Sequence, residues 1–207
     1  MESNGKTLYL IDGSALMYRA YFAFIRNPLV NSRGEETSAS FGFVNTILSL
    51  VREHDPSHLA VVFDTGRPTF RHEMYPAYKA TRQKMPPEMA AQIPRIREAV
   101  EALGLPMLEM EGWEADDVIA TLAVRAARGG FDVVLVTGDK DFMQVLGPRI
   151  SMFVPIKNEV VTADTVSGKI GVPPERVIDL MALMGDSSDN VPGLPKVGEK
   201  TACELLT

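Results

Sequence analysis

The sequence has little of what a disulfide or zinc framework needs. It contains one cysteine, Cys203, and three histidines among 207 residues. A single cysteine excludes an intramolecular disulfide framework and is typical of the reducing cytoplasm, where we expect the protein to reside. The histidines (His54, His58 and His72) stand apart from the acidic clusters in the sequence, which argues against a zinc site.

Long apolar runs and an excess of positive charge are also absent from the sequence. No hydrophobic run approaches the roughly 18–20 residues that span a bilayer. Residues 1–6 lead straight into a strand-like run, so we expect neither a membrane segment nor a signal peptide. The formal net charge of −6 argues against a nucleic-acid partner, because domains that bind nucleic acid are usually basic. The net charge does not describe the local surface, however, if acids are concentrated in one metal site and bases elsewhere.

What the chain does contain is an alternation of short apolar runs and helical patterns. Residues 7–12, 58–64 and 131–139 are apolar runs that each end in an aspartate. Continuous apolar strands separated by helices predict a parallel α/β sheet covered on both faces, in one or two domains. We expect Ser14 to cap the helix that follows the first strand, and residues 89–103 to form one helix.

Nine acidic residues are expected to meet at one edge of this sheet. Ligands bind at the carboxyl ends of parallel strands, and three strands end there in Asp12, Asp64 and Asp139. Of the other six, Asp141 follows the third strand. Glu114, Asp116 and Asp117 begin a helix, and Asp186 and Asp189 follow a later helix. One or two acids in a first helical turn are ordinary partners of the helix dipole, but three so close repel one another unless a cation joins them.

This group of carboxylates predicts hard divalent cations. Ligation by oxygen alone suits Mg²⁺ or Mn²⁺. Nine acids are too many for one such ion, so we expect two ions about 4 Å apart, the arrangement that stabilises both the attacking and the leaving oxygen of an in-line phosphoryl displacement. No nucleophilic serine or cysteine is then required, because activated water is the nucleophile.

Two other stretches carry positive charge. Residues 65–88 hold five lysines and arginines and three aromatic residues without a sustained hydrophobic period. This mixture suits a channel for single-stranded nucleic acid, and a solvated basic loop is the alternative. Residues 193–198 form a glycine-rich turn between two helices, where backbone N–H groups can bind phosphate beside Lys196 and Lys200. A purely structural turn is the alternative for this second stretch.

Seven motifs, in this order, resemble the 5′-nuclease (flap endonuclease) family, and within it the N-terminal 5′→3′ exonuclease domain of bacterial DNA polymerase I. They span residues 10–14, 62–64, 78–82, 114–117, 137–141, 185–190 and 198–202. The resemblance implies a PIN-like catalytic domain over residues 1–172, with a mobile helical arch at about residues 65–88. It also implies a helix–three-turn–helix (helix-hairpin-helix) DNA-binding region over residues 173–207, incomplete at its C-terminal end.

The resemblance also implies an activity and partners. The expected activity is structure-specific 5′→3′ exonuclease and 5′-flap endonuclease hydrolysis by two metal ions, in replication and repair. The expected substrate is DNA with a free 5′ end at flaps, nicks and RNA–DNA primers. The helical pattern is unfinished at residues 205–207, so we expect the native protein to continue, with a covalently linked C-terminal polymerase region. Nothing in the sequence indicates an oligomer, so a monomer is expected.

By the same resemblance, individual residues acquire expected roles. One metal ion is assigned to Asp12, Asp64, Glu114 and Asp116, and the other to Asp139, Asp141, Asp186 and Asp189. Asp116 lies near both ions, whereas Asp117 matches a family acid whose helix-capping alternative stays open. Lys79 and Arg82 are the expected catalytic contacts to the scissile phosphate. The remaining expected DNA contacts are Tyr18, Arg19, Arg71, Tyr78, Gly193, Lys196, Gly198 and Lys200, with a K⁺ ion expected at the hairpin.

The sequence departs from the family pattern at one position. The family commonly has a glycine where this chain has Lys196; if φ is positive there, lysine costs about 1 kcal/mol.

Four rival functions stay open. They are a stand-alone flap endonuclease, a PIN-like nuclease acting on RNA, a non-catalytic DNA-junction binding module, and a Mg²⁺-dependent phosphatase. The phosphatase is disfavoured because its first strand should end in Asp-x-Asp, whereas Asp12 is followed by glycine and serine.

Overall fold

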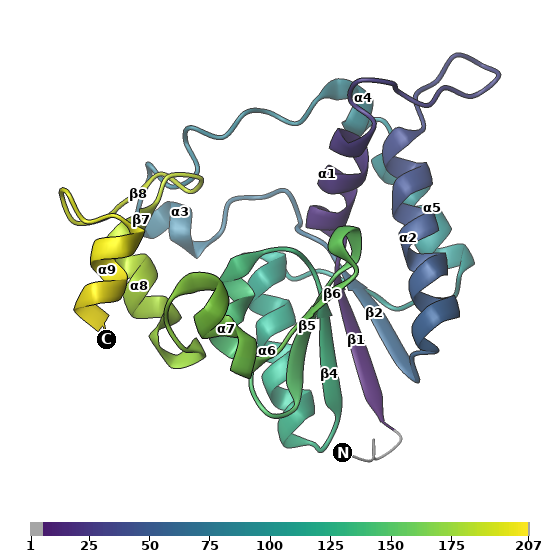
Figure 1. Cartoon of the computed structure of the whole chain (residues 1–207). Coiled ribbons are helices and arrows are strands. Elements are labelled where there is room, and N and C mark those ends of the chain that lie inside the picture. The colour runs from purple at the N-terminus through teal and green to yellow at the C-terminus, as the bar shows by residue number, and fades with distance from the viewer. Residues whose placement is uncertain (1–5, 207) are drawn as a thin grey trace.

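A six-stranded sheet forms the centre of the molecule, in the order β3-β2-β1-β4-β5-β6 (Figure 1). The computed structural model describes residues 6–206. The strands are β1 (Thr7–Asp12), β2 (His58–Val62), β3 (Met107–Leu108), β4 (Asp132–Val136), β5 (Ile150–Val154) and β6 (Glu159–Val161). Every neighbouring pair is parallel except β5 and β6. The prediction of a parallel sheet is therefore confirmed, with one antiparallel strand at its edge.

Both faces of the sheet are buried, which is why its strands read as continuous apolar runs. Successive side chains of β1 point to opposite faces: Leu10 belongs to one hydrophobic core, and Tyr9 and Ile11 belong to the other. Val61 and Val62 of β2 divide in the same way. A strand between two cores has no solvent-facing side on which polar residues would be favoured.

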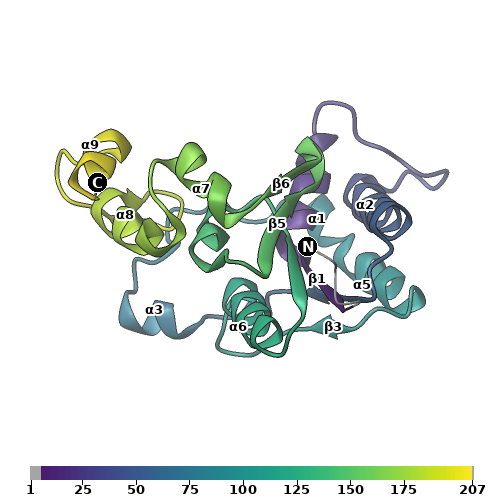
Figure 2. The same ribbon diagram turned by 60° about the horizontal axis from the view of Figure 1, so that its bottom comes forward.

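Helices form a layer on each face of the sheet (Figure 2). On one face lie α1 (Gly13–Ala23), α2 (Ser38–His54) and α5 (Ile93–Ala102). On the other lie α6 (Ala115–Arg128), the 3₁₀ helix η1 (Lys140–Val145), α7 (Ala163–Ile170) and α8 (Val177–Met184). None of the helices between residues 6 and 206 is both long and apolar enough to cross a membrane.

The prediction of one helix over residues 89–103 is wrong. The structure contains a short helix α4 (Pro87–Ala90), a turn, and then α5. Pro94 is the cause, because proline has no N–H to donate and its ring clashes with the carbonyl four residues earlier. The turn is held by Gln92, a buried side chain whose Oε1 accepts a hydrogen bond from Ser40 N at 3.0 Å.

The prediction that Ser14 caps the first helix is also wrong. Helix α1 begins directly after β1, and Asp12 is its N-cap, with Oδ1 accepting a hydrogen bond from Ala15 N at 2.9 Å. Ser14 lies inside the helix, and its Oγ accepts a hydrogen bond from Asp64 N at 3.0 Å. The serine therefore joins α1 to the chain that leaves β2.

Residues 65–88 follow an extended path above the carboxyl ends of the strands (Figure 1). They contain one short helix, α3 (Phe70–Met74), and the beginning of α4. Between α3 and α4 the chain forms turns and irregular structure, in agreement with the missing hydrophobic period.

The C-terminal region has the predicted order of helix, tight turn and helix. Helix α8 leads into a two-stranded ribbon of β7 (Gly185–Asp186) and β8 (Val191–Pro192), and α9 (Glu199–Leu206) follows. Gly193 lies against the end of α8, where a Cβ atom would come within 2.2 Å of the Met184 carbonyl carbon and oxygen. Glycine is therefore required at this position by close backbone packing.

Lys196 adopts the strained conformation that its sequence position suggested, with φ at 67°. It follows Pro195 in a turn closed by a hydrogen bond of 3.1 Å from Val197 N to Leu194 O. Proline followed by a residue with positive φ is the pattern of a type II turn, which favours glycine at the third position.

Replacing Lys196 by glycine is expected to raise the free energy of unfolding by about 0.5–1 kcal/mol, because the Cβ strain is relieved. Urea unfolding followed by fluorescence measures this change. The matched control is Lys200→Gly inside α9, which is expected to lower the same free energy by about 1 kcal/mol. A destabilising effect of both substitutions would show that Lys196 bears no strain.

Candidate metal and nucleic-acid site

Three neighbouring strands bring aspartates to the same edge of the sheet. Strands β2, β1 and β4 lie side by side, and Asp64, Asp12 and Asp139 stand at or just after their carboxyl ends. Asp12 is buried; besides capping α1, it accepts a hydrogen bond from Thr137 Oγ1 at 3.2 Å. The expected convergence of the strand-end acids is confirmed.

Helix α6 adds its acids at the same edge. Its first backbone N–H, from Ala115, donates a hydrogen bond to Asp64 Oδ1 at 2.8 Å. Glu114 is the N-cap and forms a reciprocal capping box with Asp117, whose Oδ2 accepts from Glu114 N at 3.1 Å. The helix N-terminus is thus held on the strand ends, which places Asp116 beside them.

Asp116 is surrounded by like charge. Burial, followed by the neighbouring carboxylates of Asp12, Asp139 and Asp64, raises its pKa to about 8, and Lys79 opposes the shift. Burial, together with Asp64 and Asp139, also raises the pKa of Asp12 to about 6. These four carboxylates repel one another at close range, which is the electrostatic condition that a bound cation relieves.

A second group of acids adjoins the first. Burial, together with Asp139, Asp186 and Asp189, raises the pKa of Asp141 to about 6. Asp139 caps η1 by accepting a hydrogen bond from Asp141 N at 2.9 Å. Asp139 raises the pKa of both Asp116 and Asp141, so the two groups form one continuous acidic rim.

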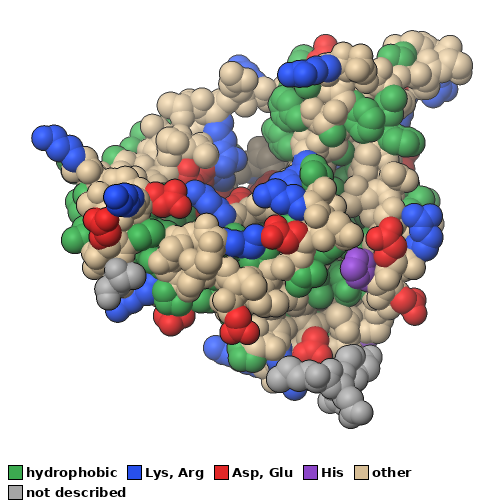
Figure 3. Space-filling model, viewed as in Figure 1, with side chains coloured by type: hydrophobic (Ala, Val, Ile, Leu, Met, Phe, Trp, Pro, Cys, Tyr) green, Lys and Arg blue, Asp and Glu red, His purple; other side chains and the backbone are tan. Residues whose placement is uncertain are grey.

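A cleft of about 450 Å³ opens beside these acids. Six acids contribute to its wall: Glu114, Asp116, Asp117, Asp141, Asp186 and Asp189. In the space-filling view, Lys and Arg side chains surround a hollow below the loop between α3 and α4 (Figure 3). The lining of the cleft itself includes Arg71 beside these carboxylates.

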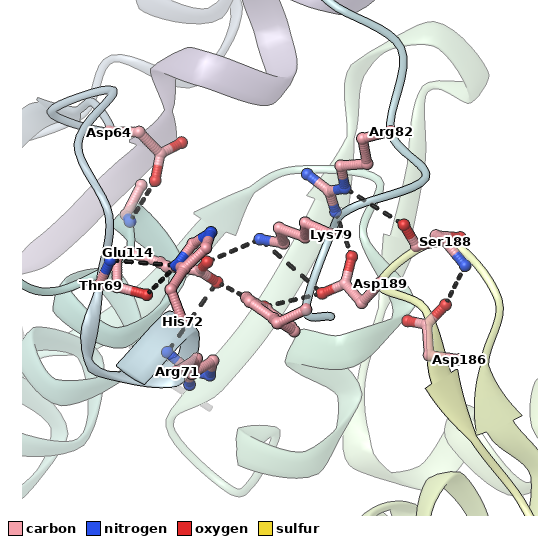
Figure 4. A network of polar contacts seen from close by, with 12 residues as sticks. Asp64, Thr69, Arg71, His72, Lys79, Arg82, Glu114, Asp186, Ser188 and Asp189 are labelled. Carbon is pink, nitrogen blue, oxygen red and sulfur yellow. Dashed lines mark hydrogen bonds and ion pairs between the residues drawn. The ribbon is translucent and has the colours of Figure 1, made fainter. Parts of the chain in front are cut away.

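Three side chains from residues 78–82 contact the acidic rim, and Figure 4 shows two of them, Lys79 and Arg82, pointing toward Glu114 and Asp189. Lys79 Nζ lies 2.7 Å from Glu114 Oε1 and 3.7 Å from Asp189 Oδ2. The buried Tyr78 hydroxyl donates to Glu114 Oε2 at 3.0 Å and is also 2.8 Å from Asp189 Oδ2. Arg82 forms an ion pair with Asp189. Of these residues, the resemblance expects Lys79 and Arg82 to contact the scissile phosphate, and Tyr78 to contact DNA near the junction.

Arg71 and Asp117 have a partnership that the sequence did not reveal. Two guanidinium nitrogens of Arg71 donate to the two oxygens of Asp117 at 2.6 and 2.7 Å. This bidentate pair, and the hydrogen bond from Glu114 N, lower the pKa of Asp117 although its burial raises it. The geometry agrees with the helix-capping alternative for Asp117. The spacing of Glu114 and Asp117 is that of a capping box and is recognisable in the sequence. The pairing of Asp117 with Arg71, 46 residues earlier, is not.

The other expected DNA contacts lie on α1, near the acids, and in the C-terminal hairpin. Tyr18 is 36% exposed on α1, with its ring stacked on Phe22 at 6.5 Å between centroids. The guanidinium of Arg19 lies against Gly138, in space that a Cβ atom would fill. Lys196 and Lys200 are exposed in the C-terminal hairpin, and Gly198 precedes α9. Their roles toward DNA stay predictions.

The carboxylates fit a hard divalent ion in chemistry, although their present arrangement is not a finished cage. Between residues 6 and 206, no group of three Asp, Glu, His or Cys side chains is placed to hold a metal ion. Three of the nine acids have cationic partners instead: Lys79, Arg71 and Arg82 form ion pairs with Glu114, Asp117 and Asp189. Asp12, Asp116 and Asp141, by contrast, retain the raised pKa values of crowded carboxylates.

The crowded carboxylates predict how stability depends on pH without divalent ions. For Asp12, Asp116 and Asp141 the folded pKa exceeds the ordinary value of 3.8, so the folded state binds more protons than the unfolded state between that value and about 6 to 8. Stability must then fall as pH rises through this window. We expect the free energy of unfolding in EDTA to decrease by several kcal/mol between about pH 5 and pH 8.5.

Urea unfolding followed by the fluorescence of Trp113, the single tryptophan, measures this decrease. Saturating Mg²⁺ should abolish most of it, because an ion that binds only the folded state offsets the repulsion. Stability that is constant or rises over this pH range in EDTA would contradict the crowding of these acids.

Comparison with known proteins agrees with this geometry. Residues 7–171 match the 5′-3′ exonuclease N-terminal resolvase-like domain, and residues 172–207 match the 5′-3′ exonuclease C-terminal SAM fold. The chain is 45% identical over 206 residues to DNA polymerase I of Bacillus caldotenax, covering 97% of this chain but 23% of the polymerase. It is 43% identical over 201 residues to the 5′-3′ exonuclease of Aquifex aeolicus, covering 97% of this chain and 69% of that protein.

A solved structure has the same fold. The bacteriophage T5 flap endonuclease, in a pseudo-enzyme-product complex with DNA and metal ions, superposes with a TM-score of 0.75 at 25% identity, over 97% of this chain and 74% of the T5 chain. The matches to both domains and to these relatives lead to one conclusion. The chain belongs to the 5′-3′ exonuclease family and contains residues of both its N-terminal resolvase-like domain and its C-terminal SAM fold.

Proposed function

We propose that the protein is a divalent-metal-dependent 5′→3′ exonuclease and 5′-flap endonuclease that hydrolyses phosphodiester bonds near a free 5′ end of DNA. The observation that carries the proposal is the acidic rim, in which Asp116 faces Asp12, Asp64 and Asp139, and Asp141 continues the rim toward Asp186. Family membership and the DNA- and metal-bound T5 relative support it.

We assign two Mg²⁺ or Mn²⁺ ions to this rim. Asp12, Asp64 and Asp116 would hold one, and Asp139, Asp141 and Asp186 the other. Glu114 and Asp189 would join when their present cationic partners move to the substrate. When bound, such ions activate water and stabilise charge on the departing oxygen. No His or Cys side chain is required in this donor set, in keeping with the preference of hard cations for oxygen.

The cationic side chains of the segment above the rim would orient the substrate. Lys79 and Arg82 now neutralise Glu114 and Asp189. A phosphodiester entering the cleft would offer them an alternative anion, and their ammonium and guanidinium groups would fix the scissile phosphate against the acids. Tyr18, Arg19 and Tyr78 would contact the strand near the junction, and Arg71 would hold the α3 end of the segment.

The C-terminal hairpin would bind the duplex. Lys196 and Lys200 are exposed beside the backbone turn at residues 193–198, where contacts to phosphates carry no base preference. We extend the proposal to a K⁺ ion at this turn, to RNA–DNA primers as substrates, and to a monomeric protein acting in the cytoplasm. A C-terminal polymerase region is proposed from the polymerase relatives, of which this chain spans 23%. The Aquifex exonuclease, spanned over 69% of its length, favours a stand-alone nuclease as the second candidate.

The direct test uses a 5′-labelled flap DNA, a nicked duplex, a blunt duplex and a single-stranded RNA. Cleavage of the flap in Mg²⁺, its loss in EDTA and weak action on the RNA are expected. A phosphomonoester assay with p-nitrophenyl phosphate serves as the control for a phosphatase. Binding to the flap without any cleavage in Mg²⁺ or Mn²⁺ would instead identify a DNA-junction binding module.

A further inference from the structure

The base of the segment above the rim is attached to the loop between β7 and β8. The Asn190 side chain donates a hydrogen bond from Nδ2 to Ala77 O at 2.7 Å, and Lys79 N donates to Asp189 O at 2.9 Å. Arg82 Nε also donates to Ser188 O at 3.3 Å. We call these contacts between residues 77–82 and 188–190 the arch-base clamp.

Two residues of the clamp have left-handed backbone conformations. Lys79 has φ at 56° and Asn190 has φ at 58°. A lysine in this region is disfavoured and persists only where surrounding contacts fix it. Asparagine tolerates the conformation better than most residues, and only an amide side chain of this length also supplies the N–H that Ala77 O accepts here. Asn190 thus satisfies a backbone and a side-chain requirement together.

The clamp determines where the neighbouring side chains point. Ala77 directly precedes Tyr78 and Lys79, whose polar atoms contact the buried Glu114. If Ala77 moved, neither side chain would retain its contact, because Glu114 is fixed as the N-cap of α6. Asn190 itself is fixed from the other side, since it directly precedes β8, which pairs with β7 at the entrance to the C-terminal hairpin.

We propose that Asn190 is a positioning residue that holds Tyr78 and Lys79 over the acidic rim through its hydrogen bond to Ala77. It joins residues 77–82 to the ribbon of β7 and β8. These two regions, both expected to contact DNA, therefore keep one relative position. Its consequence for cleavage rests on the proposed nuclease function. The attachment itself does not, and can be measured without substrate.

The informative substitution is Asn190→Gly. Glycine keeps the left-handed conformation without strain and removes the side chain whose amide group donates to Ala77 O. The matched control is Asn158→Gly, because Asn158 also has a left-handed backbone, with φ at 47°, in the turn between β5 and β6. Both variants are compared with the wild-type chain.

Hydrogen exchange in the absence of DNA and metal is the first measurement. The backbone N–H groups of Lys79, Ala80 and Arg82 are hydrogen-bonded in the clamp or in its own turns. Asn190→Gly is expected to accelerate their exchange about tenfold, without accelerating exchange in β1, whereas Asn158→Gly leaves both unchanged. Equal acceleration in β1 would mean global destabilisation and would overturn the proposal, as would unchanged exchange at residues 79–82.

Kinetics on the flap DNA is the second measurement. Asn190→Gly is expected to lower kcat about tenfold while KM changes less than about twofold, because Lys79 is misplaced but still present. If residues 79–82 exchange faster in Asn190→Gly while kcat is unchanged, the positioning role is overturned. If the wild-type chain itself cleaves nothing, the proposed nuclease function fails, and hydrogen exchange alone then decides whether Asn190 fixes the segment.

Discussion

Replacing Asp116 by asparagine is expected to reduce Mg²⁺-dependent cleavage of a 5′-flap DNA by about 10³-fold or more, because the rim loses its central carboxylate. Asp116 is the acid on which Asp12, Asp64 and Asp139 act together. Asparagine has the same shape but carries no charge, so it cannot complete the ligand set of a divalent ion. The measurement is a single-turnover cleavage assay with saturating enzyme.

The same substitution separates loss of activity from loss of structure. Removing a carboxylate with a pKa raised to about 8 should increase the stability of the metal-free protein near pH 7.5, by about 2 kcal/mol. Asp164→Asn is the control, since Asp164 is exposed in the first turn of α7, away from the rim. Cleavage by Asp116→Asn at the control rate would refute the assignment of the rim as the catalytic centre.

Replacing Lys79 by alanine is expected to slow cleavage about 10²-fold while weakening duplex binding less than about threefold. Lys79 makes its 2.7 Å ion pair with Glu114 from a side chain that is 19% exposed, so its ammonium group is placed within the cleft rather than on the surface. One lysine among several phosphate contacts contributes little to overall affinity, but a lysine at the reacting phosphate contributes to the rate. Parallel measurement of single-turnover rate and of the dissociation constant in Ca²⁺ gives both quantities.

A surface lysine provides the comparison. Lys157 is exposed in the 3₁₀ helix η2 (Pro155–Lys157), and Lys157→Ala should alter neither the rate nor the affinity by more than about twofold. If Lys79→Ala reduces rate and affinity by the same factor, then Lys79 acts as general positive charge and has no special place at the scissile phosphate.

The sequence was sufficient for the sheet and for the edge at which its acids meet. Apolar runs ending in Asp12, Asp64 and Asp139 predicted parallel strands, and neighbouring parallel strands necessarily present their carboxyl ends at one edge. These inferences succeeded because each depends on local pattern or on the geometry of a whole sheet.

The failures share a different cause. The helical period of the apolar residues continues through residues 89–103 and therefore predicted one helix. Pro94, which lacks an N–H, nevertheless divides this stretch into α4 and α5. Ser14 has the right chemistry for a cap, but Asp12 is closer to the start of α1. The Arg71–Asp117 pair depends on the path of residues 65–88, which no hydrophobic period specifies. Side-chain partners across such a segment follow from tertiary structure alone.

A crystal of this chain soaked in Mn²⁺ and measured with anomalous scattering would locate divalent ions at the acidic rim. We expect two anomalous peaks about 4 Å apart, one near Asp12, Asp64 and Asp116 and the other near Asp139, Asp141 and Asp186, with Lys79 displaced from Glu114. Peaks that lie away from these carboxylates, or none at saturating Mn²⁺, would contradict this expectation.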